Sequence, residues 1–122
     1  MTLTPEQELT LNRAIAEHVF GRPITREHGM WMEERTDMGG DKGKYCIDIP
    51  NYTRDLNAIV DVVQRWCEKH KGYWSMSYQD RMSVVIGSNT TDDGGECFDQ
   101  KEPAIALCIA FAKAAGLKGD WE

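Results

Sequence analysis

The segment Pro50–Asp55 constrains the fold of this chain more than any other stretch, because it turns an extended arm into a helix. Proline biases the preceding residue, Ile49, towards an extended conformation. Thr53 then offers a hydroxyl to the first free N–H groups of a helix, and Asp55 places a negative charge at the positive end of the helix dipole. The segment carries no catalytic signature, so it predicts architecture rather than chemistry.

Three stretches place apolar side chains at helical spacing. The first starts at the capping-box residues Thr4 and Gln7 and spans about residues 5–20. The second spans about residues 54–70, and the third begins at Pro103. They are expected to end at Gly21, Gly72 and Gly116. The inward-facing residues are predicted to be Leu9, Leu11, Ile15, Ala16, Val19 and Phe20, then Leu56, Ile59, Val60, Val63, Trp66 and Cys67, and finally Ile105, Leu107, Cys108, Phe111, Ala112 and Ala115.

Strand patterns are fewer. Residues 73–78 and 82–86 alternate apolar and polar side chains, and the joint Gln79–Arg81 suits a short hairpin. Brief strands are predicted at 45–49 and near 97–99, with a polar loop over 88–96. The rest of residues 21–50 is expected to be irregular, and Trp121 is expected to pack back onto the body. Three helices and a small, mostly antiparallel sheet indicate an α+β fold.

Length and charge narrow the class of protein. A chain of 122 residues is one domain with a single core, here residues 1–122. The formal net charge of −6 disfavours binding to a DNA or RNA polymer or to an anionic membrane, which need a basic surface. The N-terminus has no signal-peptide pattern, and no apolar run reaches the ~18 residues of a membrane span, so a cytoplasmic protein is predicted.

The sequence contains only weak patterns for a metal site or a reactive thiol. Cys46, Cys67, Cys97 and Cys108 form no CxxC pair and are expected to be free thiols. Cys67 and His70, with Cys46 or Cys97, are a possible metal set, but a core thiol and a helix-end histidine are the favoured interpretation. The acidic loop Asp92–Glu96 with Asp99 does not match a calcium loop and is interpreted as a solvated turn. We predict no metal, no cofactor and no catalytic residue.

Aromatic and arginine side chains supply the candidate ligand site. Aromatic faces stack on planar rings, and arginine binds phosphate through two N–H groups at once. A nucleotide-like ligand would suit such a set, although packing in the core or at a subunit interface is the favoured alternative for any single aromatic residue. The candidate ligand-binding residues are Trp31, Tyr52, Thr53, Arg54, Trp74, Arg81, Asn89 and Thr90.

Three segments resemble a known family. They are the helix end Ile15–Gly21, the junction Pro50–Asp55 with the valine-rich helix after it, and Glu102–Ala110. Together they are similar to the phage ABA sandwich domain, a small α/β/α module of bacteriophage genomes. The glycine-rich, charged stretch over residues 36–44 departs from the family pattern. The resemblance implies an α/β/α sandwich, with helices packed on a small sheet, and a setting in the host bacterial cytoplasm. It implies no catalytic residue.

The sequence and the family resemblance leave three functions open. The first is a non-catalytic protein that binds a small ligand, for example one that sequesters a host immune signalling nucleotide and so blunts anti-phage defence. The second is a phage accessory protein that acts by protein–protein interaction. The third is a hydrolase of a small nucleotide, although no G-x-S-x-G turn is present. Because a small sheet is marginal alone and can pair across chains, a homo-oligomer is predicted.

Overall fold

The first helix has the boundaries that the sequence predicts. The computed structural model describes residues 3–90, 92–119 and 121, and α1 spans Pro5–Phe20 within them. Thr4 Oγ1 accepts from the Gln7 N–H at 3.1 Å, and Gln7 Oε1 accepts from the Thr4 N–H at 2.8 Å. Gly21 ends the helix in the left-handed conformation, with φ of 69°. The predicted capping box and glycine stop are both confirmed.

The second helix, α2 (Leu56–His70), has different caps from those predicted. Asp55 is the N-cap and accepts from the Ala58 N–H at 3.2 Å, whereas Thr53 is buried and hydrogen-bonds to α1 instead. At the other end Lys71, with φ of 50°, adopts the left-handed conformation expected of Gly72. Gly72 instead opens the next strand, where a Cβ would meet the Gly87 carbonyl oxygen at 2.5 Å. That crowding makes the glycine a packing requirement of the strand.

The third helix, α3 (Pro103–Ala114), forms the centre of the molecule, and nearly all of its side chains are buried. It ends in a Schellman motif. The Gly116 N–H donates to the Lys113 carbonyl at 3.2 Å, and the Leu117 N–H donates to the Ala112 carbonyl at 2.8 Å. Gly116 has φ of 74°, so its role as the helix stop is confirmed.

One antiparallel sheet contains β4 (Gly72–Tyr78), β5 (Met82–Ser88) and β6 (Gly94–Gln100), in that order. The predicted hairpin between β4 and β5 is confirmed. The brief strand predicted near residues 97–99 is the longer β6, so the polar loop predicted over 88–96 is wrong for Gly94–Glu96. The side chains that β5 turns towards the helices are those of Met82, Val84 and Ile86.

A second antiparallel sheet contains β1 (Ile24–Glu27), β2 (Met30–Thr36) and β3 (Lys42–Cys46). The prediction of an irregular segment here is wrong. The strand predicted at 45–49 is instead Lys42–Cys46, so the prediction is right for residues 45 and 46 and wrong for 47–49. Most side chains of this sheet are exposed. The sequence therefore lacks the apolar alternation that a strand with one buried face shows.

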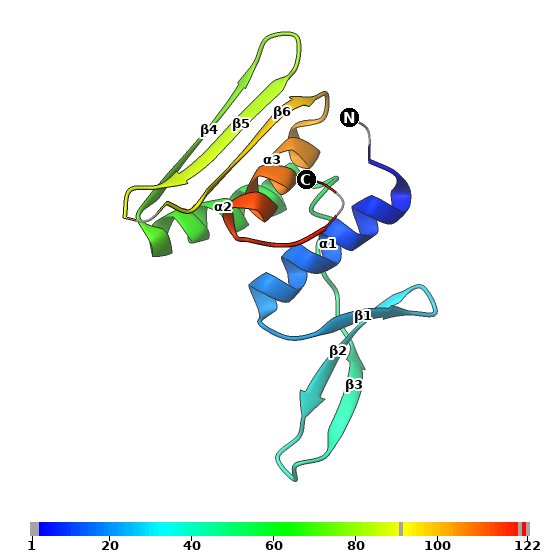
Figure 1. The fold of residues 1–122 in the computed structure, drawn as a ribbon. Coiled ribbons are helices and arrows are strands. Elements are labelled where there is room, and N and C mark those ends of the chain that lie inside the picture. The colour runs from blue at the N-terminus through cyan, green and yellow to red at the C-terminus, as the bar shows by residue number, and fades with distance from the viewer. Residues whose placement is uncertain (1–2, 91, 120, 122) are drawn as a thin grey trace.

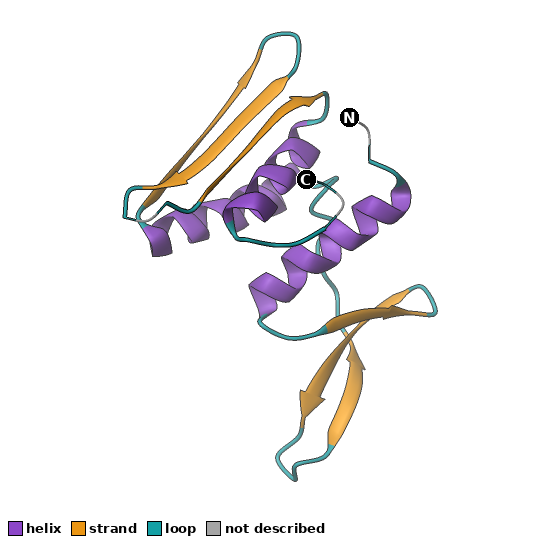
Figure 2. Cartoon of the chain, in the orientation of Figure 1, coloured by secondary structure: helices purple, strands orange, loops and turns teal. Residues whose placement is uncertain are grey.

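The elements form layers (Figure 1). Helices α2 and α3 cover one face of the β4–β6 sheet, and α1 packs on α3. The β1–β3 sheet stands away from this body and is joined to it through the end of α1 (Figure 2). The predicted α+β fold with three helices and antiparallel pairing is confirmed, with the strands divided between two sheets. Trp121, 2% exposed, packs onto the body as predicted.

Candidate functional site

A cleft of about 380 Å³ opens where the C-terminal turns of α1 and α2 meet above α3. Its apolar floor includes Val62, Trp66 and Phe111, and polar groups surround it. His18 comes from the last turn of α1, and Lys69 and His70 come from the last turn of α2. Cationic side chains are favourable at helix C-termini, so two helix ends that converge bring basic groups together.

Trp66 and His70 form the central feature of the cleft. They are one helical turn apart on α2, and their rings stack with centroids 4.6 Å apart and planes at 25°. Trp66 is buried, whereas His70 is partly exposed. The stack therefore fixes the imidazole against an apolar support and leaves it accessible from the solvent side.

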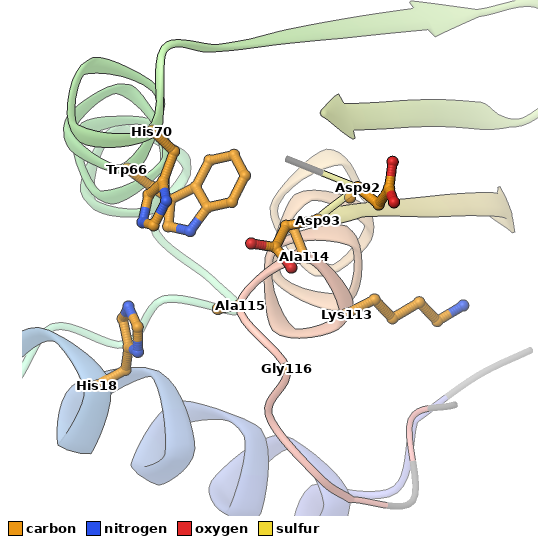
Figure 3. Close-up of a pocket in the computed structure, with 10 residues that line it drawn as sticks. His18, Trp66, His70, Asp92, Asp93, Lys113, Ala114, Ala115 and Gly116 are labelled. Atoms are coloured by element: carbon orange, nitrogen blue, oxygen red, sulfur yellow. The ribbon is translucent and has the colours of Figure 1, made fainter. Parts of the chain in front are cut away.

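His18 faces the stack from α1 (Figure 3). Its ring meets Phe111 edge-on, with centroids 5.6 Å apart. Partial burial lowers the pKa of His18, and the positive charges of Lys69 and His70 lower it further. The imidazole is therefore neutral at pH 7 and able to accept as well as donate a hydrogen bond.

The charges around the cleft differ from those of the whole chain. Arg65 and Lys69 lie on its α2 side, and Asp61 pairs with Arg65 at 3.1 Å. The cations there outnumber the anions even with both histidines neutral, although the chain carries a formal charge of −6. A small anion is attracted to such a local cluster despite the net charge of the protein.

A second hollow of about 290 Å³ adjoins the cleft and shares His18, Trp66 and His70 with it. Its far wall is made by Asp92, Asp93 and the end of α3 (Figure 3). The cleft thus contributes Arg65, Lys69 and the paired Asp61 to the surroundings of the stacked rings, and the second hollow contributes Asp92, Asp93 and Lys113. A polar ligand that carries an anionic group and N–H donors matches this arrangement.

Metal binding finds little support at this site. Within residues 3–90, 92–119 and 121, no three His, Cys, Asp or Glu side chains are grouped to hold an ion. Burial raises the pKa of the Cys67 thiol, which disfavours the thiolate that a metal needs. The side chain of Asp99, a member of the predicted acidic loop site, lies outside the part of the chain that the structure describes.

The sequence-predicted ligand residues do not form one pocket. Arg81 precedes β5 and Asn89 follows it, so the strand holds them about 27 Å apart at roughly 3.4 Å per residue. Trp31 lies on β2 in the other sheet, where it contacts the Arg26 guanidinium at 4.8 Å from its ring centroid. Trp74 lies on β4, partly buried against the core. None of the eight predicted residues lines the cleft or the adjoining hollow.

Tyr52, Thr53 and Arg54 do lie together, but in structural roles. Tyr52 and Thr53 are 2% and 1% exposed, and burial raises the pKa of the Tyr52 hydroxyl. Arg54 bridges Glu8 of α1 at 3.0 Å and Glu102, the residue before α3, at 3.2 Å. The junction therefore ties three helices together, and the packing alternative holds for Tyr52.

Asn89 and Thr90 lie beside the cleft without lining it. The Thr90 hydroxyl donates to the His70 carbonyl at 3.1 Å, and the Ser88 hydroxyl donates to the same oxygen at 2.7 Å. The Asn89 N–H donates to the Lys71 carbonyl at 3.1 Å. These contacts satisfy free backbone carbonyls at the end of α2, in the turn that carries His70.

The sequence did not predict that His18, Trp66 and His70 lie together in one site. Each has an ordinary explanation in its own helix: Trp66 belongs to the apolar stripe, and the two histidines favour helix ends. The available signal was that two helices both end in basic residues. Only the packing of α1 and α2 on α3 shows that these ends meet.

Comparison with known proteins yields little. No family model matches the chain, and no solved structure matches it. A segment of 71 residues, 54% of the chain, is 28% identical to the phenylalanine–tRNA ligase beta subunit of Chlamydia abortus, of which it covers 9%. A similarity of this extent shows no family. None of the helices in the described part of the chain has the length and hydropathy to cross a bilayer.

Proposed function

We propose that this protein binds a small nucleotide-like anion in the cleft between α1 and α2, without turning it over. The observation that carries the proposal is the stacked Trp66–His70 pair, which borders both the cleft with Arg65 and Lys69 and the hollow with Asp92 and Asp93. His70 presents an aromatic face to a planar ring, Lys69 and Arg65 attract a phosphate, and Asp93 accepts from ring N–H groups. The volume of about 380 Å³ lies at the low end for ligand pockets, which favours a mononucleotide over a larger ligand.

Sequestration is the function most consistent with this site. Binding requires only the convergent polar groups described above, whereas hydrolysis requires a positioned nucleophile and a base. The resemblance to a bacteriophage family adds a biological setting to the proposal. In that setting the ligand is a host immune signalling nucleotide, and its capture blunts anti-phage defence.

Calorimetry of the purified protein tests the proposal. The ligand panel contains AMP, GMP, cyclic dinucleotides, cyclic ADP-ribose and inorganic phosphate. We expect saturable heat with at least one nucleotide and a loss of about tenfold in affinity for Lys69→Gln, the size that one charge-assisted contact gives. The matched control is Lys42→Gln, which makes the same charge change on the distant strand β3 and is expected to bind normally.

Two further measurements complete this test. Mass spectrometry of material released from denatured protein identifies a ligand that copurifies with the protein. Chromatography of each bound nucleotide after long incubation is expected to recover it unchanged. The absence of heat with every compound overturns the proposal, and a time-dependent product supports the hydrolase alternative instead.

A second candidate function is self-association through the β1–β3 sheet. Strands β1 and β3 are the edges of this sheet, and edge strands offer unpaired backbone groups to another chain. Tyr45 on β3 is also 44% exposed, with the Arg35 guanidinium 5.4 Å from its ring centroid. We propose a homo-oligomer built on this edge, through which an accessory role by protein–protein interaction would also act.

Sedimentation velocity tests the oligomer. We expect a species larger than one chain for the unmodified protein, and dissociation by Tyr45→Lys, which places a charge on the edge. Tyr78→Lys is the control, because Tyr78 is also exposed, to 64%, but lies at the end of β4 in the other sheet. If the unmodified protein sediments as a monomer at all concentrations, self-association through the β1–β3 sheet is contradicted.

A further inference from the structure

Three sulfur atoms meet on one face of the β1–β3 sheet. Met30 and Met32 are two residues apart on β2, so their side chains point to the same face. Cys46 on β3 is directly opposite Met32 in the antiparallel register. The Cys46 Sγ lies 3.6 Å from the Met32 Sδ and 4.0 Å from the Met30 Sδ. The register of β2 and β3, rather than proximity along the chain, creates this cluster.

The distances from the Cys46 sulfur to the two methionine sulfurs match the requirement of a single metal ion. Three ligands at about 2.3 Å from an ion, in a trigonal plane, stand roughly 4 Å from one another, taking a zinc–sulfur bond as the length scale. The two separations from Cys46 are 3.6 and 4.0 Å, each within a few tenths of an ångström of this value. Methionine has three rotatable bonds and accommodates a shift of that size easily.

The chemistry of the donors selects the ion. A thiolate and two thioethers are soft ligands, which favour Cu(I) over hard cations such as Mg²⁺ or Ca²⁺. The carboxylate of Glu27 is paired with Lys44 at 2.7 Å, in a neutral pair that spans the sheet beside the sulfurs. Cys46 and Met30 are both exposed, Met30 to 50%, so an ion reaches the cluster from solvent.

We propose that Met30, Met32 and Cys46 form a binding site for one Cu(I) ion. On binding, the Cys46 thiol transfers its proton to solvent and forms a sulfur–metal bond, while each thioether donates a lone pair. Copper stays in the +1 state throughout, so no electron is transferred. The site lies on the β1–β3 sheet, apart from the cleft, and is independent of the nucleotide binding proposed above.

Anaerobic titration of the reduced protein with Cu(I), against a competing Cu(I) chelator, tests the site. We expect one equivalent to bind per chain. Met30→Leu and Met32→Leu remove one sulfur each at nearly constant volume, and each is expected to weaken binding by about tenfold, or ~1.4 kcal/mol. Met38→Leu is the matched control, because Met38 is fully exposed outside the cluster.

A readout at the thiol is independent of affinity. Ag(I) is used as a redox-inert probe, and alkylation of each cysteine is followed by peptide mass spectrometry. We expect Ag(I) to protect Cys46 and to leave the alkylation of half-buried Cys67 unchanged. Cys46→Ala is expected to abolish the one-equivalent binding, with circular dichroism confirming that the variant folds.

Several results overturn the proposal. The first is a Cu(I) affinity that Cys46→Ala leaves unchanged. The second is a Cu(I) affinity that is unchanged in a variant with both Met30→Leu and Met32→Leu. The third is a stoichiometry of one metal ion per two chains. The second result reduces the cluster to a single reactive thiol, and the third replaces the intrachain site with a bridging one.

Discussion

Asn12 secures the start of α2 from a position on α1. Its side-chain amide donates to Asn51 Oδ1 at 2.8 Å and to Thr53 Oγ1 at 3.2 Å, and its carbonyl oxygen accepts from the Thr53 N–H at 3.1 Å. Asn12 is 5% exposed and Thr53 is 1% exposed. Buried polar groups of this kind contribute little net energy when satisfied but are expensive to leave unpaired.

The substitution Asn12→Ala is therefore expected to lower the free energy of unfolding by about 2 kcal/mol, because it leaves the Thr53 N–H buried without its acceptor. Urea denaturation measures the change. Asn57→Ala is the control, since Asn57 is exposed on α2 and alanine has the higher helix propensity. Equal destabilisation by the two substitutions would contradict the role of Asn12.

His18 is the residue whose titration links the cleft to stability. Its pKa in the folded protein lies below the ordinary value of 6.5, through partial burial and then the charges of Lys69 and His70. As the pH falls below 6.5, the unfolded chain takes up this proton before the folded protein does. The contribution of neutral His18 to the free energy of unfolding is therefore fully present above pH 6.5. It is lost as the pH falls from 6.5 through the lower pKa that His18 has in the folded protein.

An NMR pH titration of the His18 ring checks this prediction. The midpoint is expected below 6.5, and Lys69→Gln is expected to raise it by removal of a nearby positive charge. Lys42→Gln, on the other sheet, is expected to leave it unchanged. A midpoint at or above 6.5 in the unmodified protein would show that burial and the α2 charges do not act on His18 as described.

At the scale of elements, α3 and β6 pack unusually closely. Gly95 on β6 faces the last turns of α3, and a Cβ there would collide with the Ala110 carbonyl oxygen and lie 2.6 Å from the Ala114 nitrogen. Both are backbone atoms, which cannot move aside as a flexible side chain can. The absence of a side chain at Gly95 therefore sets the distance between the central helix and its sheet.

Gly95→Ala is expected to lower the free energy of unfolding by about 3 kcal/mol, because overpacking forces helix and strand apart. Thermal or urea denaturation gives the value. Gly39→Ala provides the comparison, since an added Cβ there is 3.4 Å from Asp37 Oδ1, an ordinary contact. If Gly95→Ala were as mild as Gly39→Ala, the helix and strand would have to be more separable than the structure shows.

At the scale of the whole molecule, the two sheets differ in how they are supported. The β4–β6 sheet has α2 and α3 across one face, whereas the β1–β3 sheet touches the body mainly through α1 (Figure 1). Within the smaller sheet Glu33 is 1% exposed and is held by ion pairs with Arg22, at 2.8 Å, and with Arg35. In the β1–β3 sheet, these ion pairs replace the packed apolar side chains that support the β4–β6 sheet.

Hydrogen exchange is expected to be faster in β2 than in β5, although both are central strands of three-stranded sheets. Local opening of β2 exposes little apolar surface, whereas opening of β5 disrupts the core at Val84 and Ile86. Exchange monitored by mass spectrometry on peptides from the two strands measures the difference. Equal protection would contradict the prediction, because it would show that β2 is held as firmly as a strand that contributes to the core.

The sequence determined the elements whose signals are local. Residues 5–20, 54–70 and the segment after Pro103 showed helical periodicity with recognisable starts, and residues 73–86 showed the alternation of a hairpin. These patterns are readable because each such element buries apolar side chains at the spacing of its own secondary structure. The β1–β3 sheet, exposed on most of its surface, left no comparable pattern, and of its residues only Tyr45 and Cys46 belonged to a predicted strand. The resemblance to the phage ABA sandwich domain stays a prediction.

Only the tertiary structure decided which polar groups stand together. Thr53 could not be recognised as a partner of Asn12 at a separation of 41 residues, so it was assigned to the nearest helix end instead. His18 and His70 are likewise distant in sequence, and they meet only because α1 and α2 pack on the same central helix. Periodicity is a property of neighbouring residues, whereas a site is made by contacts between elements, and those contacts depend on how the whole core packs.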